Sequence, residues 1–173
     1  LSVDYEKPTA TISSDVTARK NGQTATITIL TSDTPTGLDN ADLTVSAGSA
    51  AALTTISASE YTSVFNPGAS AGGAQTLTLR AGAFTDANGN PSVASNTVSI
   101  SVDTVAPTVT GATIASNNAT STLAKAGDQI TVTLATDENV VVTGTPTIPL
   151  TLTSGVVDAT YVSGSGTRSL VFR

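Results

Sequence analysis

Short runs of alternating apolar and polar residues recur along the whole chain. The runs at 25–29, 77–79, 98–102 and 130–134 place an aliphatic or alanine side chain at every second position. A period of two is typical of half-buried antiparallel strands. Gly, Pro, Asn and Asp interrupt the runs at short intervals, as turns require, and no stretch has the period of an amphipathic helix. The pattern predicts an all-β fold of antiparallel two-sheet sandwiches.

The chain also contains two copies of one sequence pattern. LSVDYEKP at 1–8 resembles ISVDTVAP at 100–107, and GQTATITILTSD at 22–33 resembles GDQITVTLATDE at 127–138. Spacing between the copies is close to 100 residues, which is the size of an immunoglobulin-like (Ig-like) sandwich. Tandem Ig-like sandwiches are therefore expected.

The repeats set the expected domain boundaries. We expect residues 1–4 to be the last strand of a preceding repeat or a linker, 5–103 a complete Ig-like repeat, and 104–173 an incomplete second repeat. QTLTLR (75–80) also resembles RSLVFR (168–173). On that match, the second copy lacks the counterpart of the loop and the last strand of the first.

Composition narrows the chemistry that the chain can support. It has no Cys and no His among 173 residues, and aromatic residues make up 3 %. A Ser–His–Asp triad, a disulfide framework and a zinc–thiolate site are therefore excluded. Paired carboxylates for glycoside hydrolysis are not excluded by residue type, but few aromatic residues are present to grip a sugar. We expect no enzymatic activity.

Net charge and hydropathy indicate whether the chain can bind nucleic acid, a cation or a membrane. The formal net charge is −6, which disfavours binding to nucleic-acid phosphates and suits a cation. No apolar segment approaches the roughly 20 residues of a membrane span. We therefore expect no nucleic-acid partner and no membrane insertion in this segment.

The loop GAFTDANGNPS at 82–92 is the first candidate site. Asp86, Asn88 and Asn90 alternate along it, and Gly89 permits a left-handed turn. Oxygen side chains at alternate positions can hold a hard cation such as Ca²⁺. The loop does not match an EF-hand, because its Gly stands at the wrong place. A tight turn in which Asp and Asn bond their own backbone explains the same residues equally well.

Further carboxylates stand where adjoining sandwiches would meet. Asp103 ends a strand before the linker, and Asp137 and Glu138 end a strand of the second copy. A divalent cation would relieve the repulsion within such a cluster, whereas each carboxylate taken singly is typical of a solvated surface. A second, weaker site is expected at the front of the first copy, with Asp4, Glu6 and Asp33. Asp39 and Asp42 are expected to mark a turn and a strand start.

Several segments together resemble the bacterial Ig-like repeats of large surface adhesins and biofilm-associated proteins. They are AGAFTDANGNPS, SNTVSISVDTVAPTVT, AGDQITVTLATDENVVVTG and LDNADLTVSAGS. The resemblance covers essentially the whole chain and implies extracellular stalk modules on a bacterial cell surface, with Ca²⁺ at domain junctions. Carried over by position, the implied ligands are Asp86, Asn90 and Asp103, with Glu138 from the next module.

The chain departs from that family pattern at its front end. It has Ser32–Asp33 where the family usually has Ser-Glu, and Tyr5–Glu6–Lys7 where the family has Thr-x-Ala. We therefore expect weaker or different ion binding at the front junction.

Three functions are consistent with the sequence. The first is a stalk or spacer of a surface adhesin or biofilm matrix protein, stiffened by Ca²⁺, with neighbouring repeats of the same polypeptide as its partners. The second is a subunit of a surface filament or surface layer, assembled with other copies of the chain by strand exchange. The third, a carbohydrate-binding module, would need an aromatic platform that the sequence does not offer.

Overall fold

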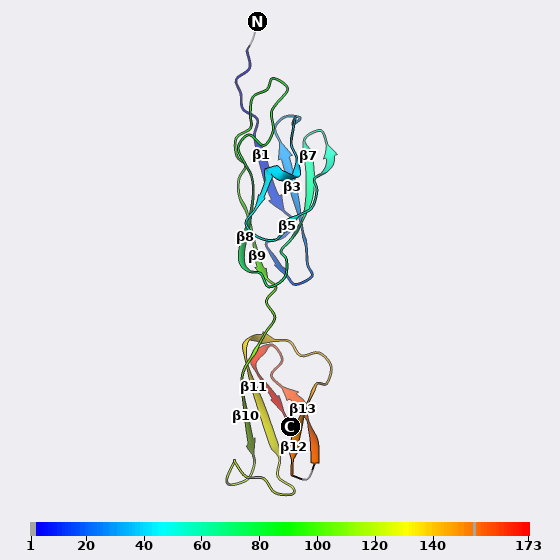
Figure 1. The fold of residues 1–173 in the computed structure, drawn as a ribbon, viewed down its shortest axis with the longest axis vertical. Helices are drawn as coiled ribbons and strands as arrows, with labels where there is room; N and C mark the ends of the chain where they lie inside the picture. The colour runs from blue at the N-terminus through cyan, green and yellow to red at the C-terminus, as the bar shows by residue number, and fades with distance from the viewer. Residues whose placement is uncertain (1–2, 154) are drawn as a thin grey trace. The chain divides into compact units, whose positions relative to one another are not determined.

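The computed structural model describes residues 3–153 and 155–173. The chain divides into two compact units, unit 1 (Leu1–Val105) and unit 2 (Ala106–Arg173), and each is described by itself. Strands and turns make up the described residues, with one short 3₁₀ turn, η1 (Asn40–Asp42), and no α-helix among them (Figure 1). The predicted all-β class with antiparallel Ig-like sheets is confirmed.

Unit 1 is built from two sheets. In the first, the strand order is β1-β3-β7-β5, with β6 also paired to β7. In the second, the order is β2-β9-β8-β4. The strands of the first sheet are β1 (Ala10–Ser14), β3 (Ala25–Thr31), β5 (Ser49–Ala50), β6 (Thr54–Ser57) and β7 (Glu60–Asn66). Those of the second are β2 (Ala18–Lys20), β4 (Leu43–Val45), β8 (Gly72–Leu79) and β9 (Val98–Asp103).

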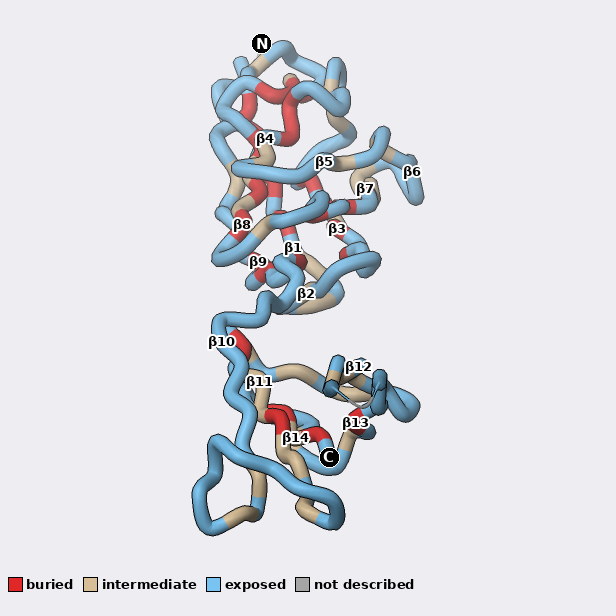
Figure 2. Tube along the Cα trace, turned by 60° about the horizontal axis from the view of Figure 1, so that its bottom comes forward, coloured by how far each residue is buried: buried red, intermediate tan, exposed pale blue. Residues whose placement is uncertain are grey.

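The core of unit 1 follows from the alternation seen in the sequence. Every second residue of β3 is buried, and its threonines at the intervening positions are more exposed. Strands β8 and β9 contribute buried residues from the second sheet in the same way. Figure 2 shows these buried positions along the strands. The largest fully buried side chains are Phe65, Phe84, Ile27, Ile29, Leu77, Leu79, Ile100, Val102 and Pro8.

The first strand changes sheets part of the way along unit 1. Residues of β1 pair antiparallel with β3, and the chain then crosses to the second sheet, where β2 pairs with β9. The β2–β9 pair is parallel, with Ala18 opposite Ser101 and Lys20 opposite Asp103. The two sheets of unit 1 are therefore joined by one continuous segment.

The outer edge of β1 is covered by a side chain in place of a strand. Asn96 Oδ1 accepts the N–H of Ile12 at 2.8 Å, and Asn96 Nδ2 donates to the carbonyl of Ile12 at 2.9 Å. The N–H of Val93 also donates to the carbonyl of Pro8, at 3.1 Å. These contacts satisfy an edge that would otherwise be open to another strand.

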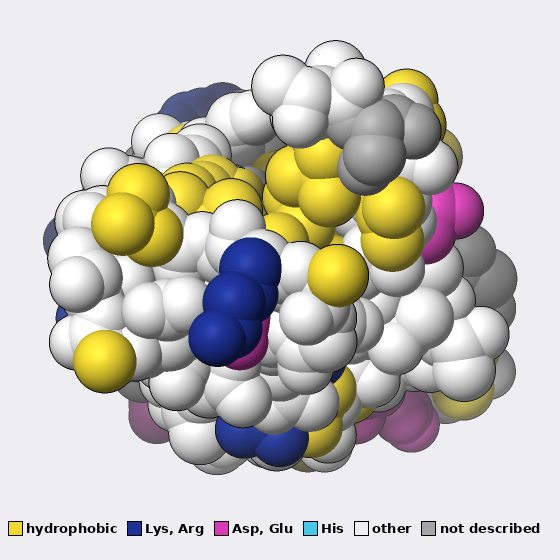
Figure 3. Space-filling model, turned by 90° about the horizontal axis from the view of Figure 1, so that it is seen from below, with side chains coloured by type: hydrophobic (Ala, Val, Ile, Leu, Met, Phe, Trp, Pro, Cys, Tyr) yellow, Lys and Arg dark blue, Asp and Glu magenta, His cyan; other side chains and the backbone are white. Residues whose placement is uncertain are grey.

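Unit 2 forms one five-stranded antiparallel sheet, in the order β10-β11-β14-β13-β12. Its core is small, with four buried apolar residues: Val132, Ala159, Leu170 and Phe172. Ile114 lies opposite Val132 but is 60 % exposed. Figure 3, which views the molecule from below, shows hydrophobic side chains gathered on the surface. The strands are β10 (Val109–Ser116), β11 (Ile130–Val140), β12 (Thr147–Leu152), β13 (Gly155–Ser163) and β14 (Thr167–Phe172).

Strand pairing corrects one sequence match. RSLVFR (168–173) was matched to QTLTLR (75–80), which forms β8 of the second sheet. In the structure, β14 pairs with β11 as β7 pairs with β3, so RSLVFR corresponds to β7. Within its described residues, unit 2 thus has the strands of the first sheet and no counterpart of the β8–β9 pair. The missing layer explains the exposed face of Ile114.

Candidate functional site

The loop at 82–92 is held in place by its own core residues. Phe84 is buried, and its carbonyl accepts the N–H of Ser92 at 2.9 Å. Thr85 is bridged to Thr36 by a pair of backbone hydrogen bonds of 2.9 and 3.0 Å. The oxygen-rich tip from Asp86 to Asn90 therefore projects from a fixed base.

Asp86 organises the tip of this loop. Its Oδ1 accepts the N–H groups of Asn88 and Asn90 at 2.9 and 2.8 Å, and its Oδ2 accepts the side-chain amide of Asn90 at 2.9 Å. Gly89 takes a positive φ of 86° to close the turn. The bond from the Asn90 side chain, helped by the backbone N–H donors and opposed by desolvation, lowers the pKa of Asp86 below 3.8. The expected turn interpretation is thus realised in the structure.

The same loop contacts the segment that enters unit 1. Asn88 Nδ2 donates to Asp4 Oδ2 at 2.8 Å, and Asn90 Nδ2 donates to the carbonyl of Asp4 at 3.3 Å. Asp4 Oδ1 accepts the N–H of Glu6 at 2.9 Å. Asn88 thus connects the carboxylates of Asp4 and Asp86, which are 82 positions apart in the chain, and the Asn90 side chain connects the Asp86 carboxylate to the Asp4 backbone carbonyl.

Asp4, Glu6 and Asp86 line an open pocket of about 250 Å³. Its four carboxylates and one ammonium give the lining a formal charge of −3. Within the described residues, no three acidic side chains come together closely enough to form a ready-made cation site. Apart from Lys7, the lining side chains all carry oxygen atoms, which are the ligands that Ca²⁺ takes. The lining consists of Asp4, Glu6, Lys7, Thr9, Ser32, Asp33 and Asp86.

The structure does not bring Asp103 to the loop that it was expected to join. Asp103 lies opposite Gly72, at the start of β8, and opposite Lys20. The 82–92 loop follows the other end of β8. The eight residues of that strand separate the two places by roughly 25 Å at about 3.3 Å per residue. The predicted grouping of Asp86 with Asp103 is therefore wrong. The loop instead joins the front set of Asp4, Glu6 and Asp33.

In unit 2, Asp137 is occupied by a structural contact. Its Oδ1 accepts the N–H of Thr108 at 2.8 Å and its Oδ2 accepts the Thr108 hydroxyl at 2.6 Å. These two bonds lower the pKa of Asp137 below 3.8. In unit 1 the same place is held by Ser32, whose Oγ accepts the N–H of Thr9 at 2.9 Å. Asp137 therefore acts within unit 2 as a latch between β11 and the segment before β10.

The next residue along keeps its equivalent place in both copies. The hydroxyl of Thr31 donates to the carbonyl of Asp33, and the hydroxyl of Thr136 donates to the carbonyl of Glu138, both at 2.7 Å. Asp33 follows the end of β3, whereas Glu138 lies within β11, which continues to Val140. The sequence did not identify Thr9, Ser32 or Lys7 as pocket residues. A signal was present, because Thr9 follows Pro8 and Ser32 precedes Asp33.

Unit 1 is an Ig-like β-sandwich of two sheets. Its first strand crosses between the sheets as β1 and β2, and its last strand, β9, pairs with β2. The model of the bacterial Ig-like domain matches residues 4–102, and the chain belongs to that family, which is typical of surface proteins. No curated protein and no solved structure gave a significant match. Among the described residues, no helix is long and apolar enough to cross a membrane.

Proposed function

We propose that the chain is a non-enzymatic spacer from the extracellular part of a bacterial surface protein, such as an adhesin or a biofilm matrix protein. The observation that carries this proposal is the tandem arrangement of two Ig-like units without a catalytic constellation in the described residues. The aromatic pair in unit 2, Tyr161 and Phe172, packs edge to face at 5.7 Å within the small core. It provides no flat platform for a sugar ring, which disfavours the carbohydrate-binding alternative.

The spacer role is tested on intact cells. An antibody against residues 3–105 is expected to bind unpermeabilised cells of the bacterium that makes the protein. Deleting one repeat in frame should shorten the surface projection, measured by electron microscopy, without abolishing display. Staining that appears only after permeabilisation would contradict an extracellular spacer.

We further propose that the front pocket of unit 1 binds Ca²⁺ and stiffens the entry of the chain. Asp4 and Glu6 lie on the exposed entering segment, while Asp86 is fixed to the sandwich. Drawing the exposed carboxylates toward Asp86 would complete an oxygen shell. Because the ion would bind the folded arrangement only, it would also stabilise unit 1. Neighbouring repeats of the same polypeptide are the partners that such a stiffened entry would orient.

Calcium binding is tested on the 173-residue chain with Asp4→Asn and Asp33→Asn. Both side chains are exposed, so these variants should fold normally. We expect millimolar Ca²⁺ to raise the melting temperature of unit 1, and each variant to reduce that shift. Asp158→Asn, on exposed strand β13, is the matched control. An unchanged melting temperature with Ca²⁺ and with chelator would remove calcium from the proposal and leave the spacer role standing.

A filament or surface layer is the second candidate, and the open face of unit 2 favours it. Exposed apolar residues such as Ile114 and Val157 lie on a sheet whose edge strands, β10 and β12, each have one paired neighbour. Strand exchange with another copy would cover them. Sedimentation at several concentrations tests this candidate, which requires a mass that rises with concentration.

A further inference from the structure

The chain contains two Asn-Gly dipeptides, Asn21–Gly22 and Asn88–Gly89, and both are exposed on turns of unit 1. An asparagine side chain reacts most readily with its own backbone where glycine follows it, because glycine has no Cβ to block the approach of its nitrogen. The local sequence alone therefore gives the two sites similar reactivity. Their hydrogen bonds and neighbouring charges differ, and these differences separate the two sites.

The reaction is a deamidation that needs only water. The backbone nitrogen of the glycine loses its proton to hydroxide and bonds to the Cγ atom of the asparagine. The Cγ–Nδ2 bond breaks, and ammonia leaves with a proton taken from water, which regenerates the hydroxide and leaves a succinimide ring. Water then opens the ring at either carbonyl and gives aspartate or isoaspartate, with nothing oxidised or reduced. The glycine nitrogen must therefore be free to reach Cγ, and nearby charge must tolerate the anion that forms.

At Asn88 both reacting groups are held by hydrogen bonds. The N–H of Gly89 donates to the carbonyl of Asp86 at 3.2 Å, and Asn88 Nδ2 donates to Asp4 Oδ2 at 2.8 Å. The N–H groups of Asn88 and Asn90, on either side of Gly89, both donate to Asp86 Oδ1. Ring closure would have to break bonds of this set and rotate a backbone segment that is fixed on both sides.

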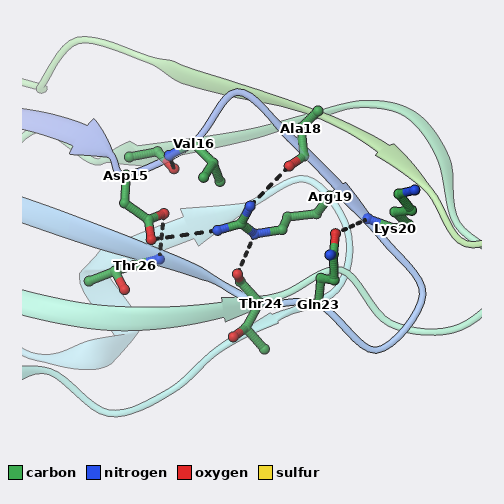
Figure 4. Close-up of polar contacts among 9 residues, drawn as sticks. Asp15, Val16, Ala18, Arg19, Lys20, Gln23, Thr24 and Thr26 are labelled. Atoms are coloured by element: carbon green, nitrogen blue, oxygen red, sulfur yellow. Dashed lines mark hydrogen bonds and ion pairs between the residues drawn. The ribbon is translucent and has the colours of Figure 1, made fainter.

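At Asn21 the hydrogen bonds lie on the neighbouring residues. The N–H of Gln23 donates to the carbonyl of Lys20 at 3.0 Å, and Gln23 Oε1 accepts the N–H of Lys20 at 3.2 Å (Figure 4). In the part of the chain that the structure describes, neither the Gly22 N–H nor the Asn21 side chain has a hydrogen-bond partner. A Cβ added at Gly22 would meet nothing within 4 Å, so the ring has room to form.

The charges near the two sites favour the same order of reactivity. Asn88 contacts two carboxylates, Asp4 through its side chain and Asp86 through its N–H. These carboxylates repel the negative charge that develops on the attacking nitrogen and on the oxygen bound to Cγ. Asn21 directly follows the cation of Lys20. Solvent ions weaken the effect of this exposed ammonium, but its sign favours the reaction.

We propose that Asn21–Gly22 is a self-modification site, which converts to aspartate and isoaspartate as the folded protein ages, and that Asp4 and Asp86 protect Asn88–Gly89 from the same reaction. This inference does not depend on the spacer role. The guanidinium of Arg19 anchors both sides of the reactive turn, because it donates to the carbonyls of Ala18 and Thr24 (Figure 4). Each event adds a negative charge and, as isoaspartate, a backbone methylene between β2 and β3, while unit 1 stays folded.

The direct test follows deamidation of the 173-residue chain in mildly alkaline buffer with chelator, once folded and once unfolded in guanidinium chloride. Cleavage after Arg80 places the two dipeptides on different peptides, and mass spectrometry measures the modified fraction of each. In the folded chain we expect Asn21 to deamidate several-fold faster than Asn88, and in guanidinium chloride we expect similar rates. An Asn88 rate that equals or exceeds the Asn21 rate in the folded chain would overturn the proposal. A ratio of rates that unfolding leaves unchanged would overturn it as well.

Asp4→Ala tests the protection of Asn88. It removes the acceptor of the Asn88 amide and one of the two carboxylates, and Asp4 is exposed, so unit 1 should fold. We expect deamidation several-fold faster at Asn88 and unchanged at Asn21, which serves as the internal reference. Val3→Ala, at the exposed neighbouring residue, is the matched control and should change neither rate. An unchanged Asn88 rate in Asp4→Ala, or an equal rise at both sites, would contradict the protection.

Asn21→Gln tests the assignment of the reactive residue. The longer glutamine side chain closes its ring much more slowly, so the modified fraction of the peptide that contains position 21 should fall to background. Because Asn21 is exposed and its side chain has no hydrogen-bond partner among the described residues, this variant should fold normally. A modified fraction that persists in Asn21→Gln would place the reaction at another residue and overturn the proposal.

Discussion

The carboxylate of Asp42 is buried in unit 1 and forms an ion pair with the guanidinium of Arg80. Asp42 Oδ2 also accepts the N–H of Asp39 at 2.9 Å, and the N–H of Arg80 donates to the carbonyl of Asp42 at 3.2 Å. This cluster joins η1 to the end of β8. The acidic pair at 39 and 42 marks a turn, as the sequence predicted, and the structure adds its cationic partner.

Arg80→Ala is therefore expected to destabilise unit 1. It leaves a buried carboxylate without its cation, although the Asp39 bond remains, so the free energy of unfolding should fall by about 1–3 kcal/mol. Urea denaturation followed by circular dichroism measures the loss. Lys20→Ala removes an exposed cation and is expected to stay within about 0.5 kcal/mol. Equal stability of Arg80→Ala and Lys20→Ala would show that the buried pair contributes nothing.

Asn96 offers a second test, because it replaces a strand at the edge of β1. Asn96→Ala exposes the N–H and carbonyl of Ile12 and should cost about 1–3 kcal/mol. Asn96→Asp keeps the acceptor and loses the donor, so a carboxylate oxygen would face the Ile12 carbonyl. We expect it to be no more stable than the alanine variant. Faster hydrogen exchange of the Ile12 amide in Asn96→Ala would locate the effect at this edge.

The pKa of Asp86 predicts a pH dependence with a definite sign. Because the folded pKa is lowered, Asp86 stabilises unit 1 above the unfolded value of about 3.9. That contribution is lost as pH falls through the lower folded pKa. In Asp86→Asn, the free energy of unfolding of unit 1 should therefore fall less on acidification through this range than it does in the wild type. Unfolding monitored by NMR of unit 1 amides, at pH 7 and at pH 3, measures the difference.

Asp128 and Asp137 have lowered pKa values in unit 2 for the same kind of reason, hydrogen bonds from Asn118 and Thr108. Their contributions have the same sign and should persist in Asp86→Asn. The amides of unit 2 thus serve as the internal reference. A change in the acid response of unit 2 alone would contradict the assignment to Asp86.

Two glycines of unit 2 separate backbone strain from steric overlap. Gly164 and Gly166 both have positive φ, 108° and 83°. A Cβ at Gly164 would overlap the carbonyl of Ser169, whereas a Cβ at Gly166 would meet nothing within 4 Å. Gly166→Ala should cost about 1–2 kcal/mol from the left-handed backbone alone. Gly164→Ala should cost more, measured as the lower stability of unit 2 to urea.

The sequence was sufficient to predict the strands of unit 1, because the apolar residues that alternate along them are the ones that the fold buries. Residues 25–29 illustrate this, since Ala25, Ile27 and Ile29 are all buried as the pattern required. The partner of a strand is less accessible from one sequence. RSLVFR alternates as well as β7 and β8 do, so only long-range pairing showed that it belongs beside β11.

The sequence identified the residues of the candidate site, but it grouped Asp86 with Asp103 and not with Asp4, Glu6 and Asp33. The spacing of Asp86, Asn88 and Asn90 identified the loop, because local spacing determines a local turn. Which end of the sandwich the loop occupies depends on the direction of the following strand. Since β9 runs toward the exit, the loop before β9 lies at the entry, beside Asp4. That reasoning was available from the strand order and would have joined Asp86 to the front carboxylates.

The pairing of β2 with β9 also constrains when unit 1 can fold as the chain is made. Ala18 finds its partner at Ser101, 83 positions later, so the closing contact of unit 1 forms only after nearly the whole repeat has emerged. Contacts of such long range are slow to form. A chain that ends before Ser101 therefore lacks the closing contact of unit 1, and the second sheet of unit 1 is completed only when β9 is available.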